Sequence, residues 1–148
     1  MTTMVEILAV LVAGTLVGSE FAVAAFFHPI LGRLPDDAFR TVRADVARLL
    51  GRVMPFWYLA SAVLLVAATA VAGPQRLLIG TAVGLMVIVV LLTVVVMVPI
   101  NNRIAAWSGT GEVSRPLAAR WDRLHLVRVT ILAVMSVLLV IGALRTLS

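Results

Sequence analysis

The chain has 148 residues, of which 62% are hydrophobic and only 13% are charged, and its mean hydropathy is +1.13. A soluble domain needs far less apolar surface, so the composition excludes that class and indicates one integral membrane domain over residues 1–148. The net charge is +5, every basic residue is Arg, and the absence of Cys excludes disulfide bridges and thiolate metal sites. Because the chain has no basic surface outside the membrane other than short loops, we expect no nucleic-acid partner.

Four apolar runs are long enough for a helix that crosses a hydrocarbon layer of about 30 Å, which takes about 20 residues. They cover residues 5–27, 53–72, 77–98 and 126–144. We therefore predict an all-α protein, a bundle of four transmembrane helices. Ser114 and Pro116 are typical of a helix start, so the last helix is expected to begin near residue 115, outside the lipid.

The first span contains an acidic residue, Glu20, about 10 Å from the end of the span at 1.5 Å per residue. A carboxylate in hydrocarbon costs ~2.5–3.5 kcal/mol, so Glu20 should face the interior of the bundle and have a partner. Arg128 is the first candidate for this partner and His125 the second. Gly14 and Gly18, four residues apart, form a pair that allows close approach of another helix.

Apolar residues recur at helical spacing between the first two spans, where Asp36 can cap a helix. We expect a short amphipathic helix over residues 36–52 that lies on the cytoplasmic membrane surface. Its predicted apolar face consists of Phe39, Val42, Val46, Leu49 and Val53. The Arg residues, Arg43 among them, lie elsewhere on the helical wheel.

The Arg residues are distributed unequally between the two sides of the membrane. Nine lie in the loops 28–52 and 99–125, and only Arg76 and Arg145 lie on the other side. Cytoplasmic loops carry an excess of basic residues, so both long loops are predicted to be cytoplasmic and both termini outside. The expected location is the cell membrane, as a multi-pass protein.

A stripe of polar and aromatic residues marks the start of the last span. On a helix, Trp121, His125 and Arg128 fall at about 0°, 40° and −20°, which is one narrow face. At the same predicted depth, the other three spans carry Glu20 and His28, Trp57 and Tyr58, and Asn101 and Asn102. We expect these side chains to share one pocket near the cytoplasmic side.

The residues of this pocket allow a catalytic interpretation. His125 is then a general base toward an acidic C–H or O–H of the substrate. Arg128 and the amides of Asn101 and Asn102 stabilise the anion that forms, as preorganised donors do in a dry site.

Two other interpretations remain open. Glu20, His28 and His125 are a possible set of ligands for a single metal ion, although eight residues on one helix place Glu20 and His28 about 80° apart. Alternatively, the polar residues only cap helix ends, extend toward the membrane surface and form a salt bridge between helices. The protein is then a non-enzymatic bundle that acts as a scaffold or binds lipid or a partner protein.

Two short motifs lie at the cytoplasmic ends of the last two spans. They are Pro99-x-Asn101-Asn102 followed by Trp107, and Trp121-x3-His125-x2-Arg128. In these motifs, and in its plan of four spans with a long basic first loop, the chain resembles the anthrone oxygenase family. The resemblance implies oxygenation of polyketide anthrones to anthraquinones, with neither flavin nor haem.

An anthrone has a weakly acidic benzylic C–H, and loss of that proton gives an enolate that can react directly with dioxygen. The expected partners are a lipophilic aromatic molecule, dioxygen and membrane lipid; no cofactor is expected, and a homo-oligomer is left open. The expected catalytic residues are His125, Arg128, Asn101, Asn102 and Glu20. The expected substrate-binding residues are Trp121, Trp57, Tyr58, Trp107 and His28.

Overall fold

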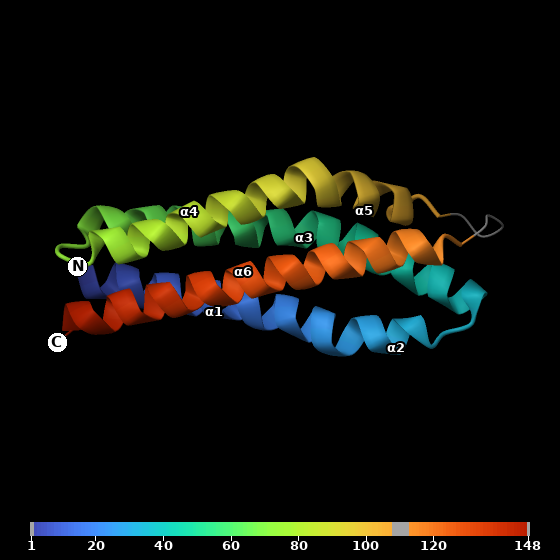
Figure 1. Ribbon diagram of the computed structural model, residues 1–148, viewed down its shortest axis with the longest axis horizontal. Helices are drawn as coiled ribbons and strands as arrows, with labels where there is room; N and C mark the ends of the chain where they lie inside the picture. The colour runs from blue at the N-terminus through green and yellow to red at the C-terminus, as the bar shows by residue number, and fades with distance from the viewer. Residues whose placement is uncertain (1, 108–112, 148) are drawn as a thin grey trace.

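The computed structural model describes residues 2–107 and 113–147, without the side chains of residues 2, 146 and 147. Regular structure in this part of the chain is entirely helical. The elements are α1 (Thr2–Ala22), η1 (Val23–Phe27), α2 (His28–Gly32), α3 (Asp36–Val71), α4 (Arg76–Leu92), η2 (Thr93–Met97), α5 (Val98–Ala105) and α6 (Arg115–Leu147). The π-helical turns η1 and η2 join their neighbours without a break, so the chain forms four continuous rods (Figure 1). The predicted all-α bundle of four helices is confirmed.

All four rods are long and apolar enough to cross a membrane. Their outward faces expose large apolar side chains, such as Leu11, Phe56, Leu77 and Val95. Lipid, unlike water, is a favourable surrounding for such a surface, and the backbone polar groups are satisfied within the helices. The protein is therefore a multi-pass membrane protein.

The rods run antiparallel in chain order and form a square in cross-section. α1 and α4 lie diagonally opposite each other, and each packs against both α3 and α6. The first and last described residues and the α3–α4 turn lie at one end of the bundle, here called the termini end (left in Figure 1). The α2–α3 turn and the start of α6 lie at the other end, here called the loop end. All four rods contribute to the main core, with Leu16, Leu65, Met86, Leu132 and Leu139 among its most buried residues.

Residues 36–52 are helical, but they do not form the separate surface helix that was predicted. They are the first half of α3, which continues to Val71. A single internal Pro55 removes one backbone hydrogen bond and is not accompanied by a turn sequence, so the helix passes through it.

The buried face of this segment also differs from the prediction. Phe39, Arg43 and Ala47 are buried, whereas Val42 and Leu49 are exposed. The reason is that this half of α3 packs against α2 and α5 of the same chain instead of resting on lipid with its most apolar face.

The pair Gly14 and Gly18 takes no part in helix packing within the chain. A Cβ atom added at either position meets no atom within 4 Å, and both residues are exposed. The face of α1 that contacts the other rods carries Ala9, Ala13 and Leu16 instead.

Candidate active site

A buried ionic cluster lies inside the bundle and is centred on Glu20, which is 2% exposed. The Arg128 guanidinium donates through Nη2 to Glu20 Oε2 at 2.6 Å, and His125 Nε2 lies 2.5 Å from the same oxygen. The Tyr58 hydroxyl donates to Glu20 Oε1 at 3.0 Å. Both partners predicted for Glu20 thus contact it, and Tyr58 is a third.

The cluster draws at least one side chain from every rod. Arg128 Nη1 donates to the hydroxyl of Thr93 in η2 at 3.4 Å. The Arg128 Cζ atom also lies 5.5 Å from the ring centroid of Tyr58 on α3. Because an unpaired charge in a buried site is strongly unfavourable, these contacts fix how each rod is rotated relative to the others.

A second group of side chains continues the cluster toward the loop end. His125 Nδ1 lies 3.2 Å from His28 Nε2, and His28 Nδ1 lies 3.5 Å from Asp122 Oδ1. The buried guanidinium of Arg43 forms an ion pair with the same Asp122 oxygen. The indole of Trp121 packs against both imidazoles, with ring centroids 5.5 Å from His28 and 4.9 Å from His125.

The π-helical turn η1 is the reason that His28 reaches His125. In an uninterrupted α-helix, the eight residues from Glu20 to His28 give an angle of about 80°. A π-turn inserts one residue into the helix without adding its rotation, so the angle falls to about −20° and the two side chains share a face. The turn η2 has the same effect on Thr93 and Asn101, which are also eight residues apart.

A cavity of about 360 Å³ lies beside the cluster. Most of its wall is apolar, and its polar groups come from Glu20, Tyr58, Thr93, Asn101, Trp121, His125 and Arg128. Several lining residues on α3 and on the η2–α5 segment, including Pro55, Leu59, Val94 and Val98, are also exposed on the outside of the bundle. The cavity therefore opens through the flank of the bundle, toward lipid, and ends in the ionic cluster.

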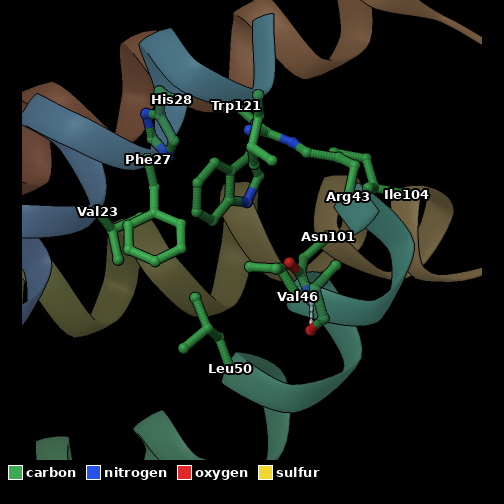
Figure 2. Close-up of a pocket in the computed structure, with 11 residues that line it drawn as sticks. Val23, Phe27, His28, Arg43, Val46, Leu50, Asn101, Ile104 and Trp121 are labelled. Atoms are coloured by element: carbon green, nitrogen blue, oxygen red, sulfur yellow. Dashed lines mark hydrogen bonds between the residues drawn. The ribbon is translucent and has the colours of Figure 1, made fainter. Parts of the chain in front are cut away.

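A second cavity, of about 20 Å³, lies toward the loop end and is lined by His28, Arg43 and Asn101 among apolar residues. Figure 2 shows the indole of Trp121 in the middle of these residues, with His28 and Phe27 on one side of it. Trp121 lines both cavities. The smaller one has room for a water molecule, which needs about 10–15 Å³, but not for an aromatic substrate.

Two buried N–H groups of the cluster lack a hydrogen-bond partner among the described residues. They are Trp121 Nε1 and Arg128 Nε, and both residues line the larger cavity. Buried donors are rarely left unpaired, so each such group calls for an explanation. Both atoms are themselves buried within the packed side chains of the cluster, although other atoms of Trp121 and Arg128 line the cavity.

A family model described as anthrone oxygenase matches residues 45–138. The chain belongs to the anthrone oxygenase family. No match was found among curated proteins or among solved structures. The matched segment includes Tyr58, Asn101, His125 and Arg128, whereas Glu20 precedes it. Family membership confirms the resemblance and, with the four spanning helices, identifies an oxygenase-family membrane protein.

Most of the site residues predicted for this anthrone oxygenase family member lie together. Glu20, Tyr58, Asn101, Trp121, His125 and Arg128 line the larger cavity, and His28 contacts His125 behind it. The Asn101 amide donates one hydrogen bond to the carbonyl oxygen of Ala47 at 3.1 Å, which joins α5 to α3.

Three predicted residues do not line either cavity. Asn102 is exposed, on a face of α5 turned away from Asn101. Trp57 packs against the main core, and Trp107 packs near Phe39 with a ring-centroid distance of 6.2 Å. Depth in the membrane places a residue at the right level, but the rotation of its helix decides which way its side chain points.

Sequence reasoning missed three residues of the site: Thr93, Arg43 and Asp122. The signal for Asp122 was its place within the Trp121–Arg128 stretch, one turn before His125. Arg43 has no signal of its own, because its burial depends on Asp122, which lies 79 residues later in the chain.

The proposed metal ligands do not surround a common point. His125 presents Nε2 to Glu20 and Nδ1 to His28, so its two nitrogens face different partners on opposite sides of the ring. In the part of the chain that the structure describes, no three His, Cys, Asp or Glu side chains are arranged to hold a metal ion. The Arg128 guanidinium also occupies the position beside Glu20 Oε2.

Proposed function

We propose that this protein is a membrane-bound oxygenase that acts on a lipophilic aromatic substrate of the anthrone type and uses dioxygen directly, without a bound cofactor. One observation carries the proposal: the Glu20–His125–Arg128 cluster forms the polar end of an apolar cavity that opens to lipid. A volume of about 360 Å³ lies within the range of small-molecule sites, roughly 300–1,000 Å³. A planar aromatic molecule that dissolves in the bilayer suits this opening and this wall.

The Glu20–His125 pair is the proposed base, instead of His125 alone. Both nitrogens of His125 contact protein side chains, so neither is free to face the substrate. A carboxylate has about four lone-pair positions, and three are used by Tyr58, His125 and Arg128. The remaining position, on Oε1, accepts the proton from the substrate C–H.

Arg128 stabilises the enolate through a transfer of charge within the site. Before the reaction, its guanidinium neutralises Glu20. When Glu20 takes the proton, the negative charge moves to the substrate and the same guanidinium neutralises the enolate, so the net charge of the cavity is unchanged. The guanidinium of Arg128, a residue that lines the cavity, is the proposed cation beside the enolate oxygen.

The remaining steps consume one dioxygen and need no external reductant. The enolate gives one electron to dioxygen, and the resulting radicals combine to form a C–OO⁻ group. The proton held by Glu20 returns to make the hydroperoxide. Glu20 then takes the second C–H proton, and the O–O bond breaks to leave a carbonyl group and hydroxide. The hydroxide takes up the proton from Glu20 and becomes water. One anthrone and one dioxygen thus give one anthraquinone and one water.

The test is oxygen uptake by the purified protein in lipid nanodiscs with anthrone, after subtraction of the blank without protein. Glu20→Gln removes the base and should lower the rate by about 100-fold or more, as loss of a general base does. Glu6→Gln is the matched control: Glu6 is also a buried acid on α1, but lies about 20 Å away toward the termini end. No uptake by the wild type, or equal rates for wild type and Glu20→Gln, would contradict the proposal.

We also propose that the loop end faces the cytoplasm and that both termini lie outside, which the nine Arg residues of the two long loops support. Because the chain has no Cys, single Cys substitutions can be labelled selectively. Gly73→Cys in the exposed α3–α4 turn should react with an impermeant maleimide in intact cells, and the exposed Asp37→Cys should not. The reverse pattern would show the opposite orientation.

A further inference from the structure

We propose that Glu20, His125, His28 and Asp122 form a proton relay between the cavity and the water at the loop end. This inference rests on the proposed function, because it assigns a route to the proton that the reaction takes from the substrate. The four side chains contact one another in series over distances of 2.5, 3.2 and 3.5 Å. Three of them are largely buried, whereas the Asp122 side chain is 30% exposed.

The position of the cavity is the reason that a relay is needed for exchange with water. Its mouth lies on the flank of the bundle, among apolar residues that face lipid. Protons do not reach the carboxylate of Glu20 through hydrocarbon at any useful rate, since a bare charge there is strongly unfavourable. The series that ends at Asp122 leads instead toward the aqueous end of the molecule.

The charges of the group define how many protons the relay holds. Glu20 and Asp122 each carry a negative charge, and Arg128 and Arg43 each neutralise one of them. With both imidazoles neutral, these four charged residues and the two His residues together have no net charge. Each imidazole then carries one N–H proton, so two protons are available for the three contacts in series. The two shorter contacts receive these protons, so His125 Nε2–H donates to Glu20 and His28 Nε2–H donates to His125 Nδ1. The third contact, His28 Nδ1 to Asp122 Oδ1, is the longest, which agrees with the absence of a proton there.

This arrangement can carry a proton inward. A proton from water binds His28 Nδ1 on the side of Asp122. The His28 Nε2–H bond breaks as its proton bonds to His125 Nδ1, and the His125 Nε2–H bond breaks as its proton bonds to Glu20. Each ring gains a proton at Nδ1 and loses one at Nε2, so both rings stay neutral, and the reverse sequence carries a proton outward from Glu20 to water. The relay therefore alternates between two arrangements, and it accepts a proton from Glu20 only in the second, in which both rings carry their protons on Nδ1 and His125 Nε2 is free.

The overall oxidation returns both substrate protons to the water that it forms, so turnover alone does not reveal the relay. Without dioxygen, however, the pair can only remove and return the CH₂ proton of anthrone. If the relay connects Glu20 to bulk water, the wild type in D₂O should replace these hydrogens by deuterium faster than the blank without protein. Isolation of the cavity from water predicts return of the same proton instead.

His28→Gln separates a relay from a purely positioning role. The Gln amide can still donate to His125 Nδ1 and hold the ring in place, but it cannot accept a proton on one side and pass one on from the other. We expect the ratio of anaerobic exchange to aerobic oxygen uptake to fall by about tenfold or more in this variant. In His28→Ala, added imidazole should restore part of the exchange. Arg123→Gln, an exposed neighbour of Asp122, is the matched control and should keep the wild-type ratio.

An unchanged ratio in His28→Gln would overturn the relay. A wild type that takes up oxygen with anthrone but shows no exchange above the blank would also overturn it, and would leave the proposed function standing. A wild type without oxygen uptake would refute the proposed function itself, and with it the relay.

Discussion

Removal of the Arg128 guanidinium is the sharpest test of the buried cluster. In Arg128→Met, Glu20 loses the donor at 2.6 Å and the guanidinium, a cation that stays charged over the physiological pH range. His125 and Tyr58 still donate to the carboxylate, but its charge is left uncompensated at 2% exposure. The variant should therefore be much less stable than the wild type.

The expected loss in the free energy of unfolding is about 3–5 kcal/mol, the cost of breaking a buried ion pair by removing one partner. At 1.4 kcal/mol for each factor of ten, this is a shift of roughly 140- to 3,700-fold in the unfolding equilibrium. A second substitution, Glu20→Gln, removes the orphaned charge and keeps one oxygen that accepts from His125, while the amide NH2 can donate to the Tyr58 hydroxyl oxygen. The double variant should regain about 1.5 kcal/mol or more, a coupling typical of residues in one network.

The measurement is unfolding by SDS in mixed micelles, followed by the fluorescence of Trp57, Trp107 and Trp121. Arg123→Met, an exposed Arg on the same helix, is the control and should change the stability by less than about 0.5 kcal/mol. A loss below about 1 kcal/mol in Arg128→Met, or no recovery in the double variant, would refute the inference that Glu20 is ionised and paired in this cluster.

Three further predictions follow from the cavity and its surroundings. Ala62→Phe places a ring in the cavity and should raise the KM for anthrone by about tenfold or more, since a filled pocket excludes the substrate; an unchanged KM would mean that the substrate binds elsewhere. Asn101→Leu should lower the free energy of unfolding by about 1 kcal/mol, because the hydrogen bond to the Ala47 carbonyl is lost, whereas the exposed Asn102→Leu should have little effect. Unfolding titrations that show equal losses for the two variants would contradict this contrast. Dialysis against EDTA should leave oxygen uptake intact, because the candidate ligands do not converge on one point; a loss restored by one added metal would reverse that conclusion.

The fold was largely predictable because hydropathy is a local property of the sequence. Four apolar runs of sufficient length define four rods, and the buried polar residues near one end define the level of the site. The continuation of α3 through Pro55 was not predictable by the same means. Whether an isolated Pro ends a helix depends on what the residues before it pack against, and here they pack against α2 and α5.

The rotation of the helices was the part of the site that the sequence did not reveal. Counting along an ideal helix separates His28 from Glu20 by about 80°, and the π-turn at Val23–Phe27 brings them onto one face. The residues of this turn, Val, Ala and Phe, do not differ from their neighbours in helical preference. The contact between His28 and His125 that this turn permits exists only in the folded chain.

The opening of the cavity on the flank of the bundle has a consequence for how kinetics must be measured. A substrate that arrives from the bilayer is diluted by lipid and not by buffer, so its effective concentration is its mole fraction in the membrane. Added empty vesicles should then slow turnover at constant total substrate, whereas a larger volume of buffer should not. Turnover rates of this protein can be compared only when the amount of lipid is stated together with the amount of substrate.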